Sequence, residues 1–361
     1  MNQPTHADVR ARIPMLLLAI LGLLAAMWAG LLRLGWDWPV LQPTLPMAHG
    51  PLMVGGFLGT VIGLERAVGL GKRWAYAAPI LTALGAVTLA IGASNQFGAL
   101  LMTLGSAWLL LALIQITRIH VALHSLLIAA GGVAFLIGNL LWLSGWLIPY
   151  VVLWWAGYVI LTVVGERLEL SRVVRLGREA YLSFGLGVTI FALGLGATVV
   201  SFDWAMRLTG VGMLSLGLWL LYFDVARRRL KAGGQARFIA VTLLSGYLWL
   251  AIGGILAISY GGFMAGPFYD AILHAIFLGF TISMIFAHAP IIFPALLRIE
   301  MRFSLRFYLH TLLLSITLTL RIVSDLLLWQ PGRQWGGLLN VVTLLFFLFN
   351  TFLSLRPLKK S

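Results

Sequence analysis

Residues 49–59 read HGPLMVGGFLG, one ionisable side chain followed by ten apolar or glycine residues. The stretch lies within a longer apolar segment, Leu45 to Leu64, which has the length of about 20 residues that a helix needs to cross a lipid bilayer. A second histidine, His274, begins another such segment. Because an ionisable side chain at membrane depth is costly unless it is coordinated, paired or kept neutral, both histidines are candidate functional residues.

The composition of the whole chain predicts an all-α membrane protein. Of the 361 residues 61% are hydrophobic and 10% are charged, and the mean hydropathy is +0.98. Apolar segments of the required length occur about twelve times. The linkers between them are short, so residues 1–361 are expected to form a single polytopic transmembrane domain. The expected spans are Ile13 to Leu32, Leu45 to Leu64, Trp74 to Ala93, Phe97 to Thr117, Leu123 to Leu143, Trp146 to Gly165, Tyr181 to Val200, Ala205 to Phe223, Phe238 to Tyr260, Asp270 to Pro290, Phe307 to Trp329 and Gly336 to Leu355.

The basic residues predict the orientation, because cytoplasmic loops of membrane proteins hold most of the Lys and Arg. A cytoplasmic N-terminus assigns 21 of the 25 Lys and Arg to that side; Arg33, Arg207 and Arg333 fall outside and Arg321 lies within a span. Both termini are then cytoplasmic, as in a multi-pass protein of the cell inner membrane. This bias and the attraction to anionic lipid explain the net charge of +14, so no nucleic-acid partner is expected.

The segment from Glu166 to Arg178 alternates charged with apolar residues and is expected to form a short amphipathic helix at the cytoplasmic interface. The chain contains no cysteine, which excludes disulfides, iron–sulfur clusters and covalently attached c-type haem. A bound metal would therefore use His, Met or carboxylate ligands.

The predicted topology places His49 and His274 near the outer face, at the same depth, where haem iron would satisfy both imidazoles. Gly56 shares a helical face with His49 and would let a flat macrocycle approach the helix, although such glycines also serve plain helix packing. Without a metal, His49 would cap its helix and His274 would bond Asp270, four residues back.

A second site is conceivable at His288, which follows His274 by 14 residues and lies on nearly the same helical face at the other side of the bilayer. His124 is a candidate partner for it. The alternative is a polar group at a helix break caused by Pro290 and the following Pro294. One haem is expected, because the position 14 residues beyond His49 holds Gly63. His6 and His310 carry no signal by themselves.

Residues 49–59 resemble the second-helix signature of membrane haem proteins related to haem-copper oxidase subunit I. Residues 273–285, LHAIFLGFTISMI, are similar to a late helix of the NnrS family, haem- and copper-containing membrane proteins associated with nitric oxide stress. The resemblance implies an oxidase subunit I-like bundle that holds a low-spin haem b between the second and tenth helices, with His49 and His274 as axial ligands. It also implies that Arg333 binds a haem propionate, and Asp270 is the expected hydrogen-bond partner of the ligand His274.

The chain departs from the oxidases because its sixth and seventh expected spans contain no histidine. Copper would have no recognisable ligand set, and oxygen reduction to water is not expected. The expected function is electron transfer or the handling of nitric oxide or another diatomic gas, with a quinol or a redox protein as partner. The alternative is a twelve-helix proton-coupled transporter in which Glu65, Arg321, Asp325 and the histidines handle protons or substrate. Arg321 and Asp325 stand one turn apart and are expected to form a structural bridge, or else part of a proton path. A membrane scaffold without chemistry is the third interpretation.

Overall fold

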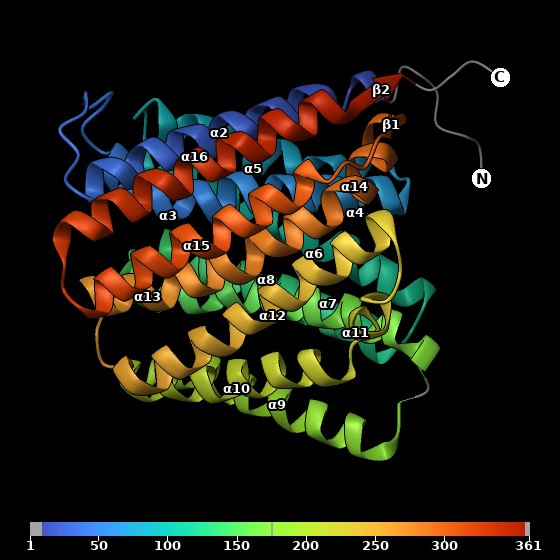
Figure 1. Cartoon of the computed structure of the whole chain (residues 1–361). Coiled ribbons are helices and arrows are strands. Elements are labelled where there is room, and N and C mark those ends of the chain that lie inside the picture. The colour runs from blue at the N-terminus through green and yellow to red at the C-terminus, as the bar shows by residue number, and fades with distance from the viewer. Residues whose placement is uncertain (1–8, 175, 358–361) are drawn as a thin grey trace. The chain divides into compact units, whose positions relative to one another are not determined.

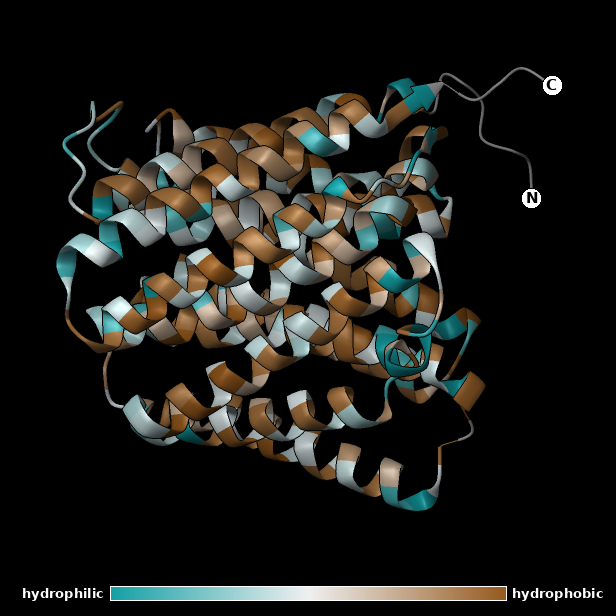
Figure 2. Cartoon of the chain, in the orientation of Figure 1, coloured by the Kyte–Doolittle hydropathy of each residue, from teal (hydrophilic) through white to brown (hydrophobic). Residues whose placement is uncertain are grey.

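The computed structural model describes residues 9–174 and 176–357 and is helical almost throughout (Figure 1). His6 lies outside the described residues, as do Arg175, Lys359 and Lys360, which were assigned with the other basic residues to the cytoplasmic side. Most of each long helix is apolar (Figure 2). The chain forms two compact units, and each is described by itself. Whether they act as the single transmembrane domain that the sequence predicts stays a prediction.

Unit 1 consists of residues up to Thr162 together with Ile292–Ile299. Its first helix, α2, is apolar, and α4 ends at Gly71, a glycine with a φ of 67°. Its elements are α2 (Ile13–Arg33), η1 (Leu45–Ala48), α3 (His49–Pro51), η2 (Leu52–Leu58), α4 (Gly59–Leu70), η3 (Arg73–Tyr76), α5 (Ala77–Ala90), α6 (Asn95–Ile119), α7 (Leu123–Leu143) and the first part of α8 (Ile148–Leu170).

Unit 2 consists of Val163–Ile291 and Glu300–Pro357. Its elements are the last part of α8, η4 (Ser171–Val174), α9 (Arg178–Gly196), η5 (Ala197–Val199), α10 (Phe202–Phe223), α11 (Ala226–Arg229), α12 (Gly234–Tyr260), α13 (Pro267–His274), η6 (Ala275–Ile282), α14 (Ser283–Leu297), whose last residues belong to unit 1, α15 (Arg306–Leu326) and α16 (Gln330–Ser354). The short strands β1 (Ile299–Met301) and β2 (Leu355–Pro357) pair with each other.

Eleven helices in the described part of the chain are long and apolar enough to cross a membrane. The sequence predicted about twelve spans. The difference is the expected span from Trp74 to Ala93, where the structure has the turn η3 followed by α5, an α-helix of only 14 residues. The all-helical class is confirmed, and the number of full-length spans is smaller by one.

Helix α9 illustrates the surface that a bilayer requires. Gly187, Phe191 and Gly194 on this helix are buried, whereas Leu182 and Leu186 are more than 60% exposed. An apolar outer face beside an inner face with small residues is the pattern of a helix that contacts lipid and packs closely against its neighbour. The lipid bilayer is therefore the environment that the exposed surface of unit 2 fits.

Two further expectations about helix ends are wrong. Helix α14 continues through Pro290 and Pro294 to Leu297, so the prolines do not break it. Prolines are tolerated in apolar helices where neighbouring groups satisfy the freed carbonyls. The segment from Glu166 to Arg178 is not a separate amphipathic helix, because α8 extends to Leu170 and is followed by the short turn η4.

The helices that carry the two candidate histidines share a feature that the sequence did not predict. Residues Leu52–Leu58 (η2) and Ala275–Ile282 (η6) are π-helical, and each segment begins within three residues of a candidate histidine. In η6 the hydroxyl of Thr281 donates to the carbonyl oxygen of Ile276, five residues back, at 3.1 Å. Wide π-helical turns are rare and often accompany functional sites.

Candidate functional site

His49 is held in unit 1 by a hydrogen bond to a neighbouring helix. Its Nδ1 lies 2.7 Å from the backbone oxygen of Ala26 in α2. A carbonyl oxygen can only accept, so Nδ1 carries the proton and Nε2 carries the lone pair of the neutral imidazole. The surroundings are apolar, with Leu45, Ala48 and Leu52 packed in one buried cluster with Ala26.

The imidazole of His49 packs against a glycine. A Cβ added at Gly30 of α2 would lie 2.9 Å from Cε1 of His49 and 3.0 Å from its Nδ1, closer than real Cβ contacts. The absence of a side chain at Gly30 therefore makes room for the ring. Gly56, predicted to face a macrocycle, instead packs against α5, where an added Cβ would lie 2.8 Å from Cβ of Ala86. Its part in cofactor binding stays a prediction.

His274 is the last residue of α13 in unit 2. Its ring, like that of His49, turns Nδ1 toward a backbone oxygen. Its Nδ1 lies 2.9 Å from the backbone oxygen of Asp270 and 3.3 Å from the carboxylate oxygen Oδ1 of that residue. Nδ1 is again the donor, so in the neutral imidazole the lone pair lies on Nε2. The predicted contact between His274 and Asp270 is confirmed, and the side chain of His274 is about one fifth exposed.

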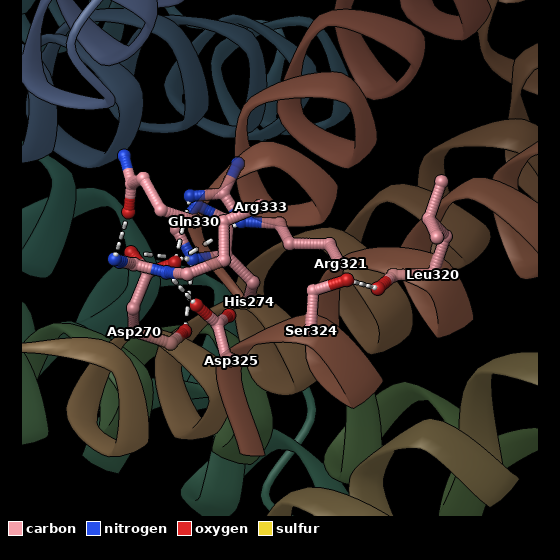
Figure 3. Close-up of polar contacts among 8 residues, drawn as sticks. All are labelled: Asp270, His274, Leu320, Arg321, Ser324, Asp325, Gln330 and Arg333. Carbon is pink, nitrogen blue, oxygen red and sulfur yellow. Dashed lines mark hydrogen bonds and ion pairs between the residues drawn. The ribbon is translucent and has the colours of Figure 1, made fainter. Parts of the chain in front are cut away.

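A cluster of charged side chains surrounds His274 (Figure 3). Nε and Nη2 of Arg321 donate to Oδ2 of Asp270 at 3.1 and 2.7 Å. Nε of Arg333 donates to Oδ1 of Asp325, and its Nη1 donates to Oε1 of Gln330 at 2.8 Å. The expected bridge between Arg321 and Asp325 does not form. Arg321 pairs instead with Asp270 of α13, and Asp325 pairs with Arg333 of α16. The two ion pairs therefore connect α13, α15 and α16.

The close approach of α15 and α16 allows this pairing. An added Cβ at Gly336 of α16 would lie 2.8 Å from Cα of Arg321, so the two backbones nearly touch. Arg333 lies in the first turn of α16 and not in a loop, as its position between the two expected spans had suggested. Removing one member of a buried pair leaves an uncompensated charge, which typically costs about 3–5 kcal/mol.

The remaining predicted site residues lie in different units. His124 is buried in the first turn of α7 in unit 1, whereas His288 in α14 belongs to unit 2, where its Nδ1 lies 2.7 Å from the backbone oxygen of Met284. The predicted ligands His49 and His274 are divided in the same way. Both pairings therefore stay predictions, while the orientation of His49, His274 and His288 is defined within their own units.

Sequence reasoning missed a buried ion pair in unit 2. Nε and Nη2 of Arg167 donate to the two carboxylate oxygens of Asp224 at 2.8 and 2.7 Å, with side chains 5% and 0% exposed. Oδ1 of Asp224 also accepts from the backbone N–H of Ala226, which fixes the turn between α10 and α11. Arg167 falls in the segment that was expected to form an amphipathic helix at the interface, and Asp224 directly follows the expected span from Ala205 to Phe223.

His310 was also missed by sequence reasoning. It is 2% exposed, and the rings of Phe286 and Phe347 lie with centroids 4.6 and 5.3 Å from the imidazole centroid. Its Nδ1 accepts a long hydrogen bond of 3.4 Å from Nδ2 of Asn350. The signal in the sequence was its place on the buried face of an amphipathic helix, beside Phe307.

Among the described residues no group of three or more His, Asp and Glu side chains is arranged to hold a metal ion by itself. A haem needs no more than two axial ligands, so this does not bear on the predicted haem site.

The helices and the buried ion pairs together define a helical protein with the spans of a multi-pass membrane protein. The chain belongs to the family DUF8744, a domain of unknown function, which matches residues 12–356. No curated protein and no solved structure matches the chain.

Proposed function

We propose that this protein is an integral membrane b-type haem protein in which His49 and His274 are the axial ligands of one haem. Its function is electron transfer or the handling of nitric oxide or another diatomic gas. The resemblance of residues 49–59 and 273–285 to oxidase-related and NnrS proteins motivates the proposal. A bound haem would supply a one-electron centre and, once one ligand has left, a binding site for a gas.

The observation that supports the proposal most strongly is the orientation shared by the two imidazoles. Each donates its Nδ1–H to a backbone carbonyl oxygen, at 2.7 Å for His49 and 2.9 Å for His274. Histidines that bind metals usually have this arrangement, because the bond at one nitrogen fixes the ring and leaves the lone pair on the other. With the proton on Nδ1, each ring would bind iron through Nε2.

The surroundings of the two histidines fit axial ligands. Gly30 leaves room for the ring of His49, and Asp270 lies beside Nδ1 of His274, where a carboxylate increases the basicity of a ligand. Arg333 is the proposed partner of a propionate, since its bonds to Asp325 and Gln330 use two of the five N–H donors of a guanidinium. Because both axial positions are taken by histidine, electron transfer is favoured over gas binding.

We also propose that the protein lies in the cell inner membrane with both termini in the cytoplasm, with a quinol or a redox protein as electron partner. The distribution of the Lys and Arg supports this orientation. Reporters fused after Lys231 and at the C-terminus are expected to report the cytoplasm, and one placed within residues 261–266 the outside. A cytoplasmic signal from residues 261–266 would contradict the orientation and the shared outer depth of the two histidines.

A second candidate function is proton-coupled transport. Two ion pairs favour this function. Asp270 pairs with Arg321, and Asp325 pairs with Arg333, so charged groups connect three apolar helices. Charged residues inside membrane spans often bind substrates or protons.

The haem content of the purified protein distinguishes the two functions. Pyridine haemochrome analysis of protein from haem-replete cells is expected to give one haem per chain. Protein without haem would contradict the first proposal and leave transport as the leading function. A ratio near two that falls to one in His288→Ala would contradict the expectation of one haem and would place a second one at His288.

A further inference from the structure

One face of α15 carries polar side chains along nearly the whole helix. His310, Thr317, Arg321 and Asp325 are spaced by seven, four and four residues, which places them on one stripe. All four are at least nine-tenths buried. From His310 to Asp325 the helix rises about 22 Å, most of the roughly 30 Å of a bilayer core. We call these four residues the α15 polar face.

Helix α16 supplies partners to three of the four residues of the α15 polar face, and the fourth, Arg321, pairs with Asp270 of α13. The hydroxyl of Thr317 donates to Oδ1 of Asn340 at 2.7 Å. Asn350 bonds His310 near one end of the helix, and Arg333 bonds Asp325 near the other. The polar groups of two antiparallel helices therefore meet at several depths within unit 2.

Three buried polar atoms along this interface have no hydrogen-bond partner among the described residues. They are Nε2 of His310, Nδ2 of Asn340 and Oδ2 of Asp325. Asn350 Nδ2 can only donate, so Nδ1 of His310 accepts and the unpartnered Nε2 carries a proton. Buried donors and acceptors of this kind are normally satisfied by internal water.

A buried asparagine in unit 1 shows the contrasting arrangement. Oδ1 of Asn139 accepts from Nε1 of Trp155 at 3.1 Å, and its Nδ2 donates to the backbone oxygen of Met102 at 3.4 Å. Both ends of this amide are used by protein groups. Asn139 is thus a structural crosslink, whereas Asn340 keeps a donor for another group.

The charges of the α15 polar face do not oppose the passage of a proton. Arg321 is neutralised by Asp270, and Arg333 is neutralised by Asp325. An unpaired guanidinium would repel a proton, as cationic groups do in water channels. The unpartnered Oδ2 leaves Asp325 able to accept one.

We propose that the α15 polar face is a proton-transfer path between His310 and Asp325, completed by internal water. His310 takes up a proton at one ring nitrogen and releases one from the other. The hydroxyl of Thr317 accepts a proton from one neighbour while its own passes to the next, so it is unchanged after each transfer. Oδ2 of Asp325 accepts the proton to give the neutral acid and then returns it to water. The path does not depend on haem.

Proton flux into liposomes tests this path. Purified protein is reconstituted in vesicles that contain a pH-sensitive dye, and a potassium gradient with valinomycin imposes a membrane potential. The wild-type protein is expected to acidify the lumen faster than protein-free vesicles do. Thr317→Val should slow this about tenfold, the factor that corresponds to about 1.4 kcal/mol at the barrier. His310→Phe keeps an aromatic ring beside Phe286 and Phe347 and should slow the acidification by a similar factor.

Two variants separate proton transfer from a structural role. Thr317→Ser keeps the hydroxyl and should retain the wild-type flux. Thr209→Val is the matched control, because Thr209 is equally buried in α10 but bonds only carbonyl oxygens of its own helix. If Thr317→Val fails to reconstitute, His310→Phe carries the comparison. Wild-type flux no greater than that of empty vesicles would overturn the proposal. So would an unchanged flux in both Thr317→Val and His310→Phe.

Discussion

His49 and His274 present the same imidazole orientation through different means. The ring of His49 reaches across to the backbone of α2 and lies against Gly30 among apolar side chains. The ring of His274 bonds its own helix and stands beside Asp270, which Arg321 holds from α15. One site is shaped by close packing and the other by charge. The two histidines should therefore tolerate different substitutions around them.

The largest effect is expected from removing either imidazole. His49→Ala and His274→Ala should each abolish the low-spin haem spectrum, because neither site has a second histidine on the same turn to replace the ligand. Absorption spectroscopy of the purified variants measures this. His120→Ala, at the exposed end of α6, is the control and should keep the spectrum. Full haem occupancy in both ligand variants would show that the ligands are elsewhere.

A smaller effect is expected from crowding His49. Gly30→Ala places a methyl group within 2.9 Å of the imidazole, so the ring must move. Overpacking of this kind costs about 1–3 kcal/mol, and haem occupancy and thermal stability should both fall. Gly69→Ala is the matched control, because an added Cβ at Gly69 meets nothing within 4 Å. Equal haem occupancy in the two variants would argue against a ligand role for His49.

The smallest effect on the haem itself is expected from the charge beside His274, whose loss also breaks the ion pair with Arg321 and so lowers the stability of the fold. Asp270→Asn removes a negative charge next to a ligand while keeping an oxygen for the hydrogen bond, so the midpoint potential of the haem should become more positive by tens of millivolts. Potentiometric titration measures the shift. Asp203→Asn serves as control, since Asp203 pairs with Arg207 at a part of the surface where both side chains are about 40% exposed. If the midpoint potential shifted by the same amount in both variants, Asp270 would have no special role.

The apolar spans could be predicted from the sequence because burial in lipid requires long uninterrupted apolar runs. The segment expected from Phe238 to Tyr260 is α12, Gly234–Tyr260, and the one expected from Leu123 to Leu143 has the predicted bounds. Helix α5 is shorter than the expected span from Trp74 to Ala93, because residues Arg73–Tyr76 form a 3-10 turn before it and the helix ends at Ala90. Composition alone does not distinguish such a turn from a helix end.

The partners of the polar side chains could not be predicted in the same way. Spacing in the sequence relates Arg321 to Asp325 on one helix, but packing of α13 and α16 against α15 offers each a better partner. The π-helical segments after His49 and His274 were not predicted either, and Gly56 in the first of them lies against Ala86 of α5. Local sequence indicated the correct contact only for His274 and Asp270, which lie one turn apart.

The most direct test of the central claim is the absorption spectrum of the purified protein reduced with dithionite. If His49 and His274 bind one b-type haem, the reduced protein should show the sharp α and Soret bands of a low-spin, six-coordinate haem, and extraction with acidified organic solvent should remove them because the haem is not covalently attached. A colourless protein from haem-replete cells, or a high-spin spectrum unchanged by His49→Ala and His274→Ala, would contradict the proposed ligation.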